Sequence, residues 1–139
     1  MNGNRGFDTQ GCRERSRQMR AVRMRLIAYI EQVYCHRQFF NLLYRDLAAI
    51  AVEPHKRNLL LHLADLEQQG MDRCVRALRR LQRQVPEACD NALQRTWRRI
   101  LVLAGPRLAL TWIDHIKRTD MQRRVDLLRR LKVMKMFKA

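Results

Sequence analysis

The chain has 139 residues, of which 47% are hydrophobic, so it can bury the core of one domain, and its composition excludes wholesale disorder. Lysine and arginine number 29 against 13 acidic residues, a formal net charge of +16. This excess predicts an anionic partner (nucleic acid, an acidic protein or an anionic membrane surface), with a solvated arginine-rich surface as the alternative. Apolar runs are too short for a membrane span or a secretory signal, so a reducing cytoplasm is the expected compartment.

Residues 1–16 are polar, contain glycine and show no periodicity, so they are predicted to be a flexible basic tail before a single helical bundle over 17–139. From about Ser16 to Val52 there is no glycine or proline, and apolar residues recur at helical spacing. The apolar stripe comprises Leu26, Ile30, Val33, Phe40, Tyr44, Leu47 and Ala51. Arg37 interrupts it, at a position where the stripe requires an apolar residue.

Glu53-Pro54 marks a turn, and a second helix is predicted from about Pro54 to Val85. Its stripe comprises Leu60, Leu63, Glu67, Gly70, Cys74, Ala77 and Leu81. The middle of this stripe is polar or empty, at Glu67 and Gly70. A short turn between two long helices predicts an antiparallel hairpin.

A third helix is predicted from near Glu87, with Gly105-Pro106 kinking or breaking it. Thr119 and Asp120 either cap a last helix over 121–137 or lie within a continuous one, so three or four helices are both compatible with the pattern. The cationic, amphipathic C-terminal segment is expected to pack on the bundle, with an acidic membrane or partner as the alternative.

The four cysteines are widely spaced, at Cys12, Cys35, Cys74 and Cys89. They form neither a CxxC pair nor a cysteine–histidine ligand cluster, so neither a disulfide framework nor a zinc site is predicted. Cys74 lies on the apolar stripe of the second helix and is interpreted as a small buried hydrophobic residue.

Two segments of the predicted hairpin, YRDLA (44–48) and RNLLLHLADLE (57–67), resemble the first hairpin of rubrerythrin-type ferritin-like domains, in particular those attached to vacuolar-iron-transporter-like proteins. The region 103–117 is similar to the third helix of that family, with Gly105 as its kink glycine. The resemblance spans roughly residues 26–118. It implies an all-α, antiparallel ferritin-like bundle of three to four helices with a kinked third helix.

The family holds two irons with inward-facing Glu and Glu-x-x-His side chains. Matched position by position, the ligand positions of the family fall on Arg37, Glu67, Gly70, Asp114 and Lys117. Only Glu67 keeps its family identity, and two cations and a glycine cannot bind iron. The resemblance therefore implies that the di-iron site is lost, and no cofactor is expected.

Arg37 and Glu67 stand mid-stripe on neighbouring antiparallel helices, so we expect them to form an ion pair across the core, because a buried carboxylate requires a partner. The alternative is that Arg37 extends to solvent. A residual metal site is a further alternative, and its candidate ligands are His36, Glu67, Asp114 and His115. The two histidines each lie one residue off a stripe and are expected to point about 100° away from it.

Arginine pairs suggest a nucleic-acid or anion surface if they converge on one face. The pairs are Arg79 and Arg80, Arg98 and Arg99, Arg123 and Arg124, and Arg129 and Arg130. Trp97 and Trp112 are predicted to be core residues, and no enzyme motif is present. The leading interpretation is a non-catalytic protein-interaction module that forms a homodimer. Residual iron binding and nucleic-acid binding are the alternatives.

Overall fold

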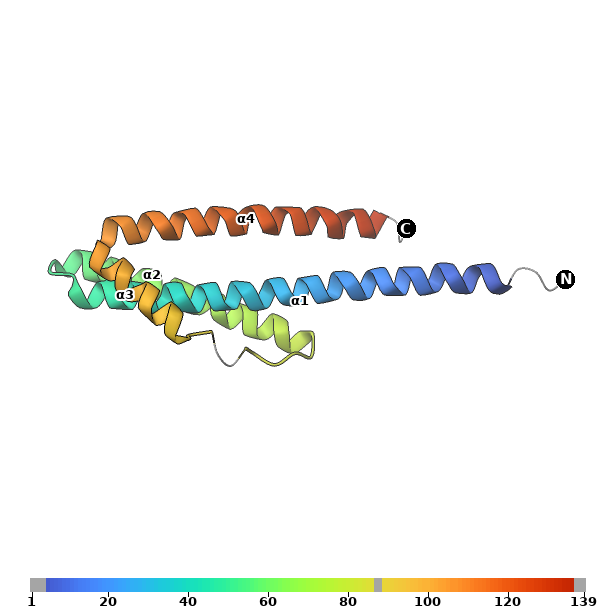
Figure 1. The fold of residues 1–139 in the computed structure, drawn as a ribbon, viewed down its shortest axis with the longest axis horizontal. Helices are drawn as coiled ribbons and strands as arrows, with labels where there is room; N and C mark the ends of the chain where they lie inside the picture. Colours follow the sequence, from blue (N-terminus) through green and yellow to red (C-terminus); the bar gives the residue numbers. More distant parts are fainter. Residues whose placement is uncertain (1–4, 87–88, 137–139) are drawn as a thin grey trace.

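The structure is a computed structural model of the chain and describes residues 5–86 and 89–136. These residues form four α-helices and no β-strand, which confirms the predicted all-α class. The helices are α1 (Arg5–Ile50), α2 (Pro54–Arg80), α3 (Ala92–Ala104) and α4 (Pro106–Met136) (Figure 1). None of them is long and apolar enough to cross a membrane.

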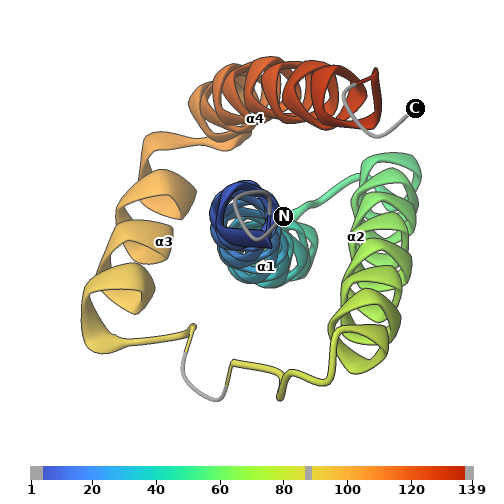
Figure 2. The ribbon, with the colours of Figure 1, turned by 90° about the vertical axis from the view of Figure 1, so that its right-hand side faces the viewer.

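The helices are arranged around α1 (Figures 1 and 2). Both α2 and α4 run antiparallel to α1 on different sides of it, and α3 crosses α1 obliquely before the chain turns into α4. The main packing is between α1 and α2, whereas the backbones of α2 and α4 do not contact each other. Side chains of α2 and α4 therefore meet only where they reach past α1 toward each other.

The α1–α2 hairpin forms as the hydrophobic pattern predicts. Pro54 occupies the first turn of α2, where its missing N–H costs no hydrogen bond. In α1, Phe40, Tyr44 and Leu47 are buried at steps of four and three residues. The hydrophobic core comprises Phe39, Phe40, Leu43, Tyr44, Leu47, Ala48, Leu60, Ala64, Leu101, Ala109 and Ile113. All four helices contribute to it.

The N-terminal end of α1 differs from the sequence prediction. Residues 5–16, expected to be a loose tail, are helical, and the side chains described from Thr9 onward are exposed. Once a helix is nucleated, each further residue adds a hydrogen bond at little cost, and each of the two glycines in this stretch, Gly6 and Gly11, costs only about 1 kcal/mol relative to alanine. Arginine, glutamate and glutamine in this stretch are good helix formers, so the helix extends without an apolar face.

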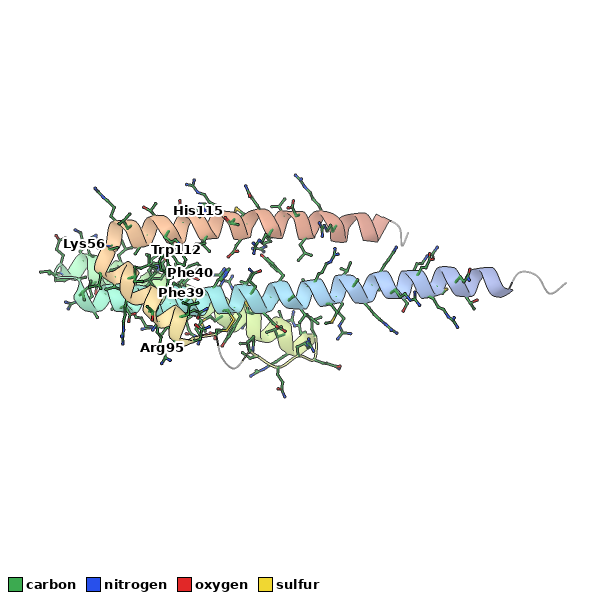
Figure 3. The ribbon with its side chains drawn as sticks, viewed as in Figure 1. Phe39, Phe40, Lys56, Arg95, Trp112 and His115 are labelled. Atoms are coloured by element: carbon green, nitrogen blue, oxygen red, sulfur yellow. A yellow bond between two sulfur atoms is a disulfide. The ribbon has the colours of Figure 1, made fainter. Side chains whose placement is uncertain are left out.

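Aromatic rings join α1, α3 and α4 at one point, and Figure 3 shows Phe39, Phe40 and Trp112 lying close together there. Trp112 meets Phe39, Phe40 and Trp97 edge to face, with ring centroids 5.4, 6.0 and 5.8 Å away. Trp112 packs against the core, as predicted. Trp97 is 39% exposed, so it covers Trp112 from the surface and is not a core residue.

Gly105 separates α3 from α4. Its φ of +103° is a conformation that residues with a Cβ rarely adopt, and Pro106 then begins α4. The predicted kink is therefore a complete break. Beyond it α4 continues through Thr119 and Asp120 to Met136, so a separate last helix starting at 121 is wrong. The end of that predicted segment, residues 137–139, lies outside the described residues.

A disulfide joins Cys35 on α1 to Cys89 in the segment before α3, with Cα atoms 5.2 Å apart. It was not predicted from the sequence, because pairing depends on the approach of two residues 54 positions apart, which spacing motifs do not reveal. Cys12 is exposed and Cys74 is half-buried, and both are free thiols. The disulfide anchors the α2–α3 connection to the central helix.

Candidate functional site

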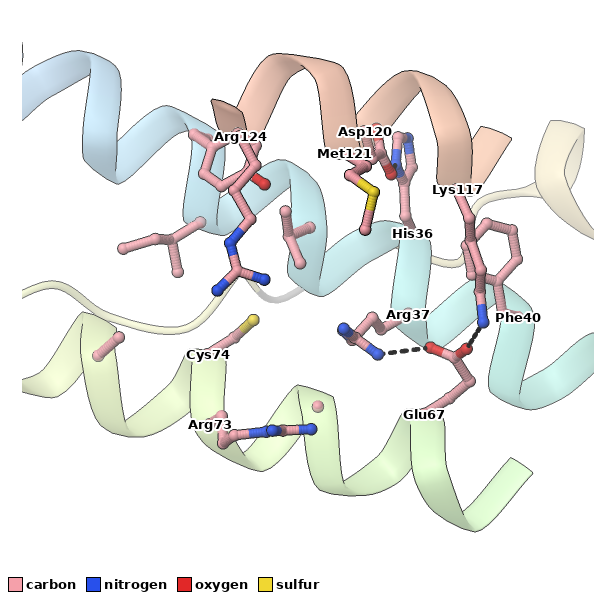
Figure 4. Close-up of a pocket in the computed structure, with 15 residues that line it drawn as sticks. His36, Arg37, Phe40, Glu67, Arg73, Cys74, Lys117, Asp120, Met121 and Arg124 are labelled. Atoms are coloured by element: carbon pink, nitrogen blue, oxygen red, sulfur yellow. Dashed lines mark hydrogen bonds and ion pairs between the residues drawn. The ribbon is translucent and has the colours of Figure 1, made fainter. Parts of the chain in front are cut away.

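The carboxylate of Glu67 is buried midway along α2, with 2% of the residue exposed. Arg37 Nη1 on α1 donates a hydrogen bond to Glu67 Oε2 at 3.0 Å, and Lys117 Nζ on α4 donates one to Glu67 Oε1 (Figure 4). Both carboxylate oxygens therefore have a cationic donor. The three residues tie together helices whose backbones would otherwise meet only through α1.

Gly70 makes room for the Arg37 side chain. A Cβ built at position 70 would lie 2.6 Å from Arg37 Cζ, well inside van der Waals contact. Gly70 follows Glu67 by three residues, so both face α1. The absence of a side chain at Gly70 lets the Arg37 side chain pass close to α2 and reach Glu67.

Lys117 is held by aromatic rings as well as by Glu67. Its Nζ lies 5.6 Å from the ring centroid of Phe40 and 5.8 Å from that of Tyr44. Burial raises the pKa of the Tyr44 hydroxyl, and the positive charge of Lys117 partly opposes this rise. The buried part of the site is thus a carboxylate and a phenol facing two cations.

The predicted ion pair between Arg37 and Glu67 is confirmed, and the alternative in which Arg37 extends away to solvent is wrong. The participation of Lys117 was not predicted from its chemistry. Its only sequence signal was the resemblance, which matched Lys117 to a ligand position of the ferritin-like family. Four of the five positions matched to family ligands (Arg37, Glu67, Gly70 and Lys117) meet in this one place.

The candidate metal ligands do not converge. Asp114 is exposed and pairs with Arg118 at 3.0 Å, and His115 is exposed. Ile113 and Lys117 define the inward face of α4, so residues 114 and 115 point about 80° and 180° away from the centre of that face. Over residues 5–86 and 89–136, no group of three or more histidine, cysteine, aspartate or glutamate side chains is placed to hold a metal ion.

His36 contacts α4 instead of a metal-ligand set. Its Nδ1 lies 2.9 Å from Asp120 Oδ2, which forms a second polar link between α1 and α4. Asp120 lies one turn beyond Lys117 on the same face of α4. Of the four candidate metal ligands, Glu67 is paired with two cations and His36 with Asp120, whereas Asp114 and His115 are exposed. The four side chains therefore do not form a metal site in this structure.

A cleft of about 450 Å³ extends from the Glu67 ion pairs along α1, between α2 and α4 (Figure 4). Its polar lining includes Arg37, Glu67, Arg73, Lys117 and Arg124. Its apolar lining comprises Tyr29, Ile30, Val33, Phe40, Ala77 and Met121. A concave space with an apolar wall and a few convergent charges has the character of a small-molecule site.

The predicted arginine pairs lie on three different helices. Arg98 is 13% exposed at its side chain and bonds Asp46 and Asp90, so it is a structural residue that fixes α3. The other predicted arginines are exposed: Arg79, Arg80, Arg99, Arg123, Arg124, Arg129 and Arg130. The exposed arginines near the start of α1 were not predicted to form a cationic surface, because residues 1–16 were predicted to be a flexible tail.

No known protein family, curated protein sequence or solved structure matches this chain. The resemblance to ferritin-like domains is therefore limited to the segments 44–48, 57–67 and 103–117.

Proposed function

We propose that the protein is a non-catalytic helical binding module whose partner is nucleic acid. The main support is the N-terminal arm, defined as residues 9–25 of α1. The arm contains six arginines and one acidic residue, and all six arginines are exposed: Arg13, Arg15, Arg17, Arg20, Arg23 and Arg25. The residues before Arg23 project beyond the end of α2, where Arg23 Nη2 donates a hydrogen bond to Leu81 O at 3.0 Å, and the first turns of the arm extend beyond α4 as well (Figure 1).

The arginines of the N-terminal arm are distributed around all sides of the helix. Successive residues of an α-helix are about 100° apart, so Arg13, Arg17 and Arg20 lie within about 60° of one another. Arg15 and Arg25 lie about 160° and 120° from Arg13. A helix that is cationic on all sides suits a groove with phosphates on both walls, and the major groove of a duplex admits one α-helix.

An acidic protein would present its charge mostly on one face, which would leave half of these arginines without a partner. Arginine forms two parallel hydrogen bonds with phosphate as it does with carboxylate, so the choice between the two partners depends on how the charge is distributed around the helix. Residues 118–130 of α4 supply a second cationic stretch, with five arginines and two acidic residues. These features favour a polyphosphate backbone over an acidic protein surface.

The proposal is tested by measuring the affinity for a labelled 20-base-pair DNA duplex, and for the same sequence as RNA, across a salt series. The logarithm of the binding constant should fall linearly with the logarithm of the salt concentration. Replacing Arg13, Arg17 and Arg20 together by glutamine should reduce the slope by about three, since each phosphate contact contributes about 0.9.

A matched control removes the same charge from exposed positions outside the N-terminal arm. The triple variant R76Q/R95Q/R107Q changes three exposed arginines of α2, α3 and α4 and should leave the slope nearly unchanged. An equal loss in both triple variants would show that only net charge matters and would overturn the assignment to the arm. Absence of binding by the unchanged protein at low salt would overturn nucleic acid as the partner.

Self-association into the predicted homodimer is a second candidate function. Large apolar side chains are exposed on the two helices that project past α2: Met19, Met24, Met121 and Val125. A second copy that covered them would extend the core. Light scattering at micromolar concentration tests this idea, with a monomer at all salt concentrations counting against it. Because the copies are both strongly cationic, association should strengthen as salt rises.

We also propose that the chain derives from a ferritin-like bundle whose metal site has been replaced by ion pairs. Support comes from Arg37 and Lys117, which occupy two positions that the resemblance matches to metal ligands and whose charges surround the retained Glu67. Cationic side chains here replace the charge of the lost metal. Metal analysis of protein purified without chelator tests this, and near-stoichiometric iron or zinc would contradict it.

A further inference from the structure

The cleft between α1, α2 and α4 contains more positive charge than its own acidic residues can neutralise. Glu67 is occupied by Arg37 and Lys117, and Asp120 by His36. Two further cations line the cleft, Arg73 from α2 and Arg124 from α4. The ion pairs among the described side chains include neither of them.

Arg73 and Arg124 approach the cleft from its two separate walls. In Figure 4, Arg124 extends from α4 toward α2, on the side where Cys74 lies, and Arg73 lies along α2 beside the cleft. The charge of Arg124 also lowers the pKa of Tyr29 against the larger effect of burial, which indicates that Arg124 and Tyr29 are neighbours. Two cations on opposite walls can hold one anion between them by charge-assisted hydrogen bonds.

Most of the remaining lining is apolar. Ile30, Val33 and Ala77 are half-buried, and Met121 is exposed at the cleft edge. Half-buried aliphatic side chains in a concave space gain free energy when an apolar ligand displaces the water from them. The cleft therefore offers an anionic head-group position at its arginines and an apolar wall beside it.

We propose that this cleft binds a small amphiphile with an anionic head group, a carboxylate or a phosphate, and an alkyl body. Arg73 and Arg124 hold the head group, and the alkyl body lies along Ile30, Val33 and Ala77. This ligand is distinct from the nucleic acid proposed for the N-terminal arm, because the arm residues do not line the cleft. Arg124 belongs both to the cleft lining and to the cationic stretch 118–130 of α4, so the arm variants are the ones that separate the two proposals.

The test is calorimetric titration of the full chain with dodecanoate below its micellar concentration. The variants R73Q and R124Q should each weaken binding by about tenfold or more, since a hydrogen bond to a charged group is lost. R76Q and R123Q are matched controls, because they remove the same charge from the same helices outside the cleft lining, and their affinities should stay within about twofold of the unchanged protein.

Probe chemistry separates this site from nonspecific adsorption. Butanoate should bind more than about tenfold more weakly than dodecanoate, because it buries eight fewer methylene groups. Comparing the affinity for dodecyl phosphate with that for dodecanoate shows which head group the cleft prefers, and tight binding of either supports the proposal. Dodecyltrimethylammonium binding as tightly as dodecanoate, or equal losses in the R73Q and R76Q variants, would overturn it. The triple variant R13Q/R17Q/R20Q should bind dodecanoate normally, so failure here is distinguishable from failure of the nucleic-acid proposal.

Discussion

Gly70 on α2 lies against the guanidinium of Arg37 on α1, at a position where a Cβ would come within 2.6 Å of Arg37 Cζ. A shift of the guanidinium away from position 70 would disturb its bond to the buried Glu67, because Nη1 donates that bond. The glycine and the arginine are therefore coupled: the empty position at 70 allows the ion pair at 67.

This coupling predicts opposite effects of one substitution in two backgrounds. G70A should destabilise the unchanged protein by about 1–3 kcal/mol, because the clash exceeds the gain in helix propensity. In an R37A background the clash is absent, and the same substitution should stabilise by up to about 1 kcal/mol. Urea unfolding of the four proteins measures both effects. The same sign in both backgrounds would show that Gly70 is not reserved for Arg37.

Removal of Arg37 should leave Glu67 under-compensated. R37L is expected to destabilise the fold by roughly 1–3 kcal/mol, less than for a fully buried pair, because Lys117 still bonds Glu67 and the Arg37 side chain is one-third exposed. The double variant R37L/E67L should recover most of the loss. Thermal unfolding checks both variants. Unchanged or higher stability in R37L alone would contradict the structural importance of the pair.

The Cys35–Cys89 disulfide should stabilise the fold by restricting the unfolded chain. Reduction is expected to cost about 2–4 kcal/mol, because the bond closes a loop of 54 residues. The double variant C35S/C89S should unfold at the same temperature with and without reductant, whereas the unchanged protein should lose stability on reduction. Disulfides persist mainly in oxidising compartments, so thiol trapping in cells also tests the predicted cytoplasmic location.

Alkaline pH should destabilise the fold, because the hydroxyls of two tyrosines then lose their protons. Burial raises the pKa of both Tyr29 and Tyr44 above the ordinary 10.0, so the folded chain holds these two protons more tightly than the unfolded chain does. Their contribution to stability is complete below pH 10 and is lost as the pH rises above it. Urea unfolding between pH 8 and about 11 should show a smaller loss in Y44F. An equal loss in Y44F would exclude Tyr44 as a source.

Local pattern in the sequence determined the class of fold and the hairpin. Apolar residues spaced by three and four, together with Pro54, predicted α1 paired with α2, because helical periodicity and proline stereochemistry act over a few residues. The same periodicity identified Arg37 and Glu67 as misplaced charges on facing stripes, and a buried carboxylate requires a partner. The sequence alone therefore predicted their ion pair.

Tertiary structure decided what depends on distant approach. Lys117 reaches Glu67 only because the break at Gly105 turns α4 back along α1, and no local pattern specifies that path. The Cys35–Cys89 bond and the projection of the N-terminal arm depend equally on where separate helices stop and pass one another. Helix periodicity identifies the face that is buried, whereas its partner is determined by the packing of the whole chain.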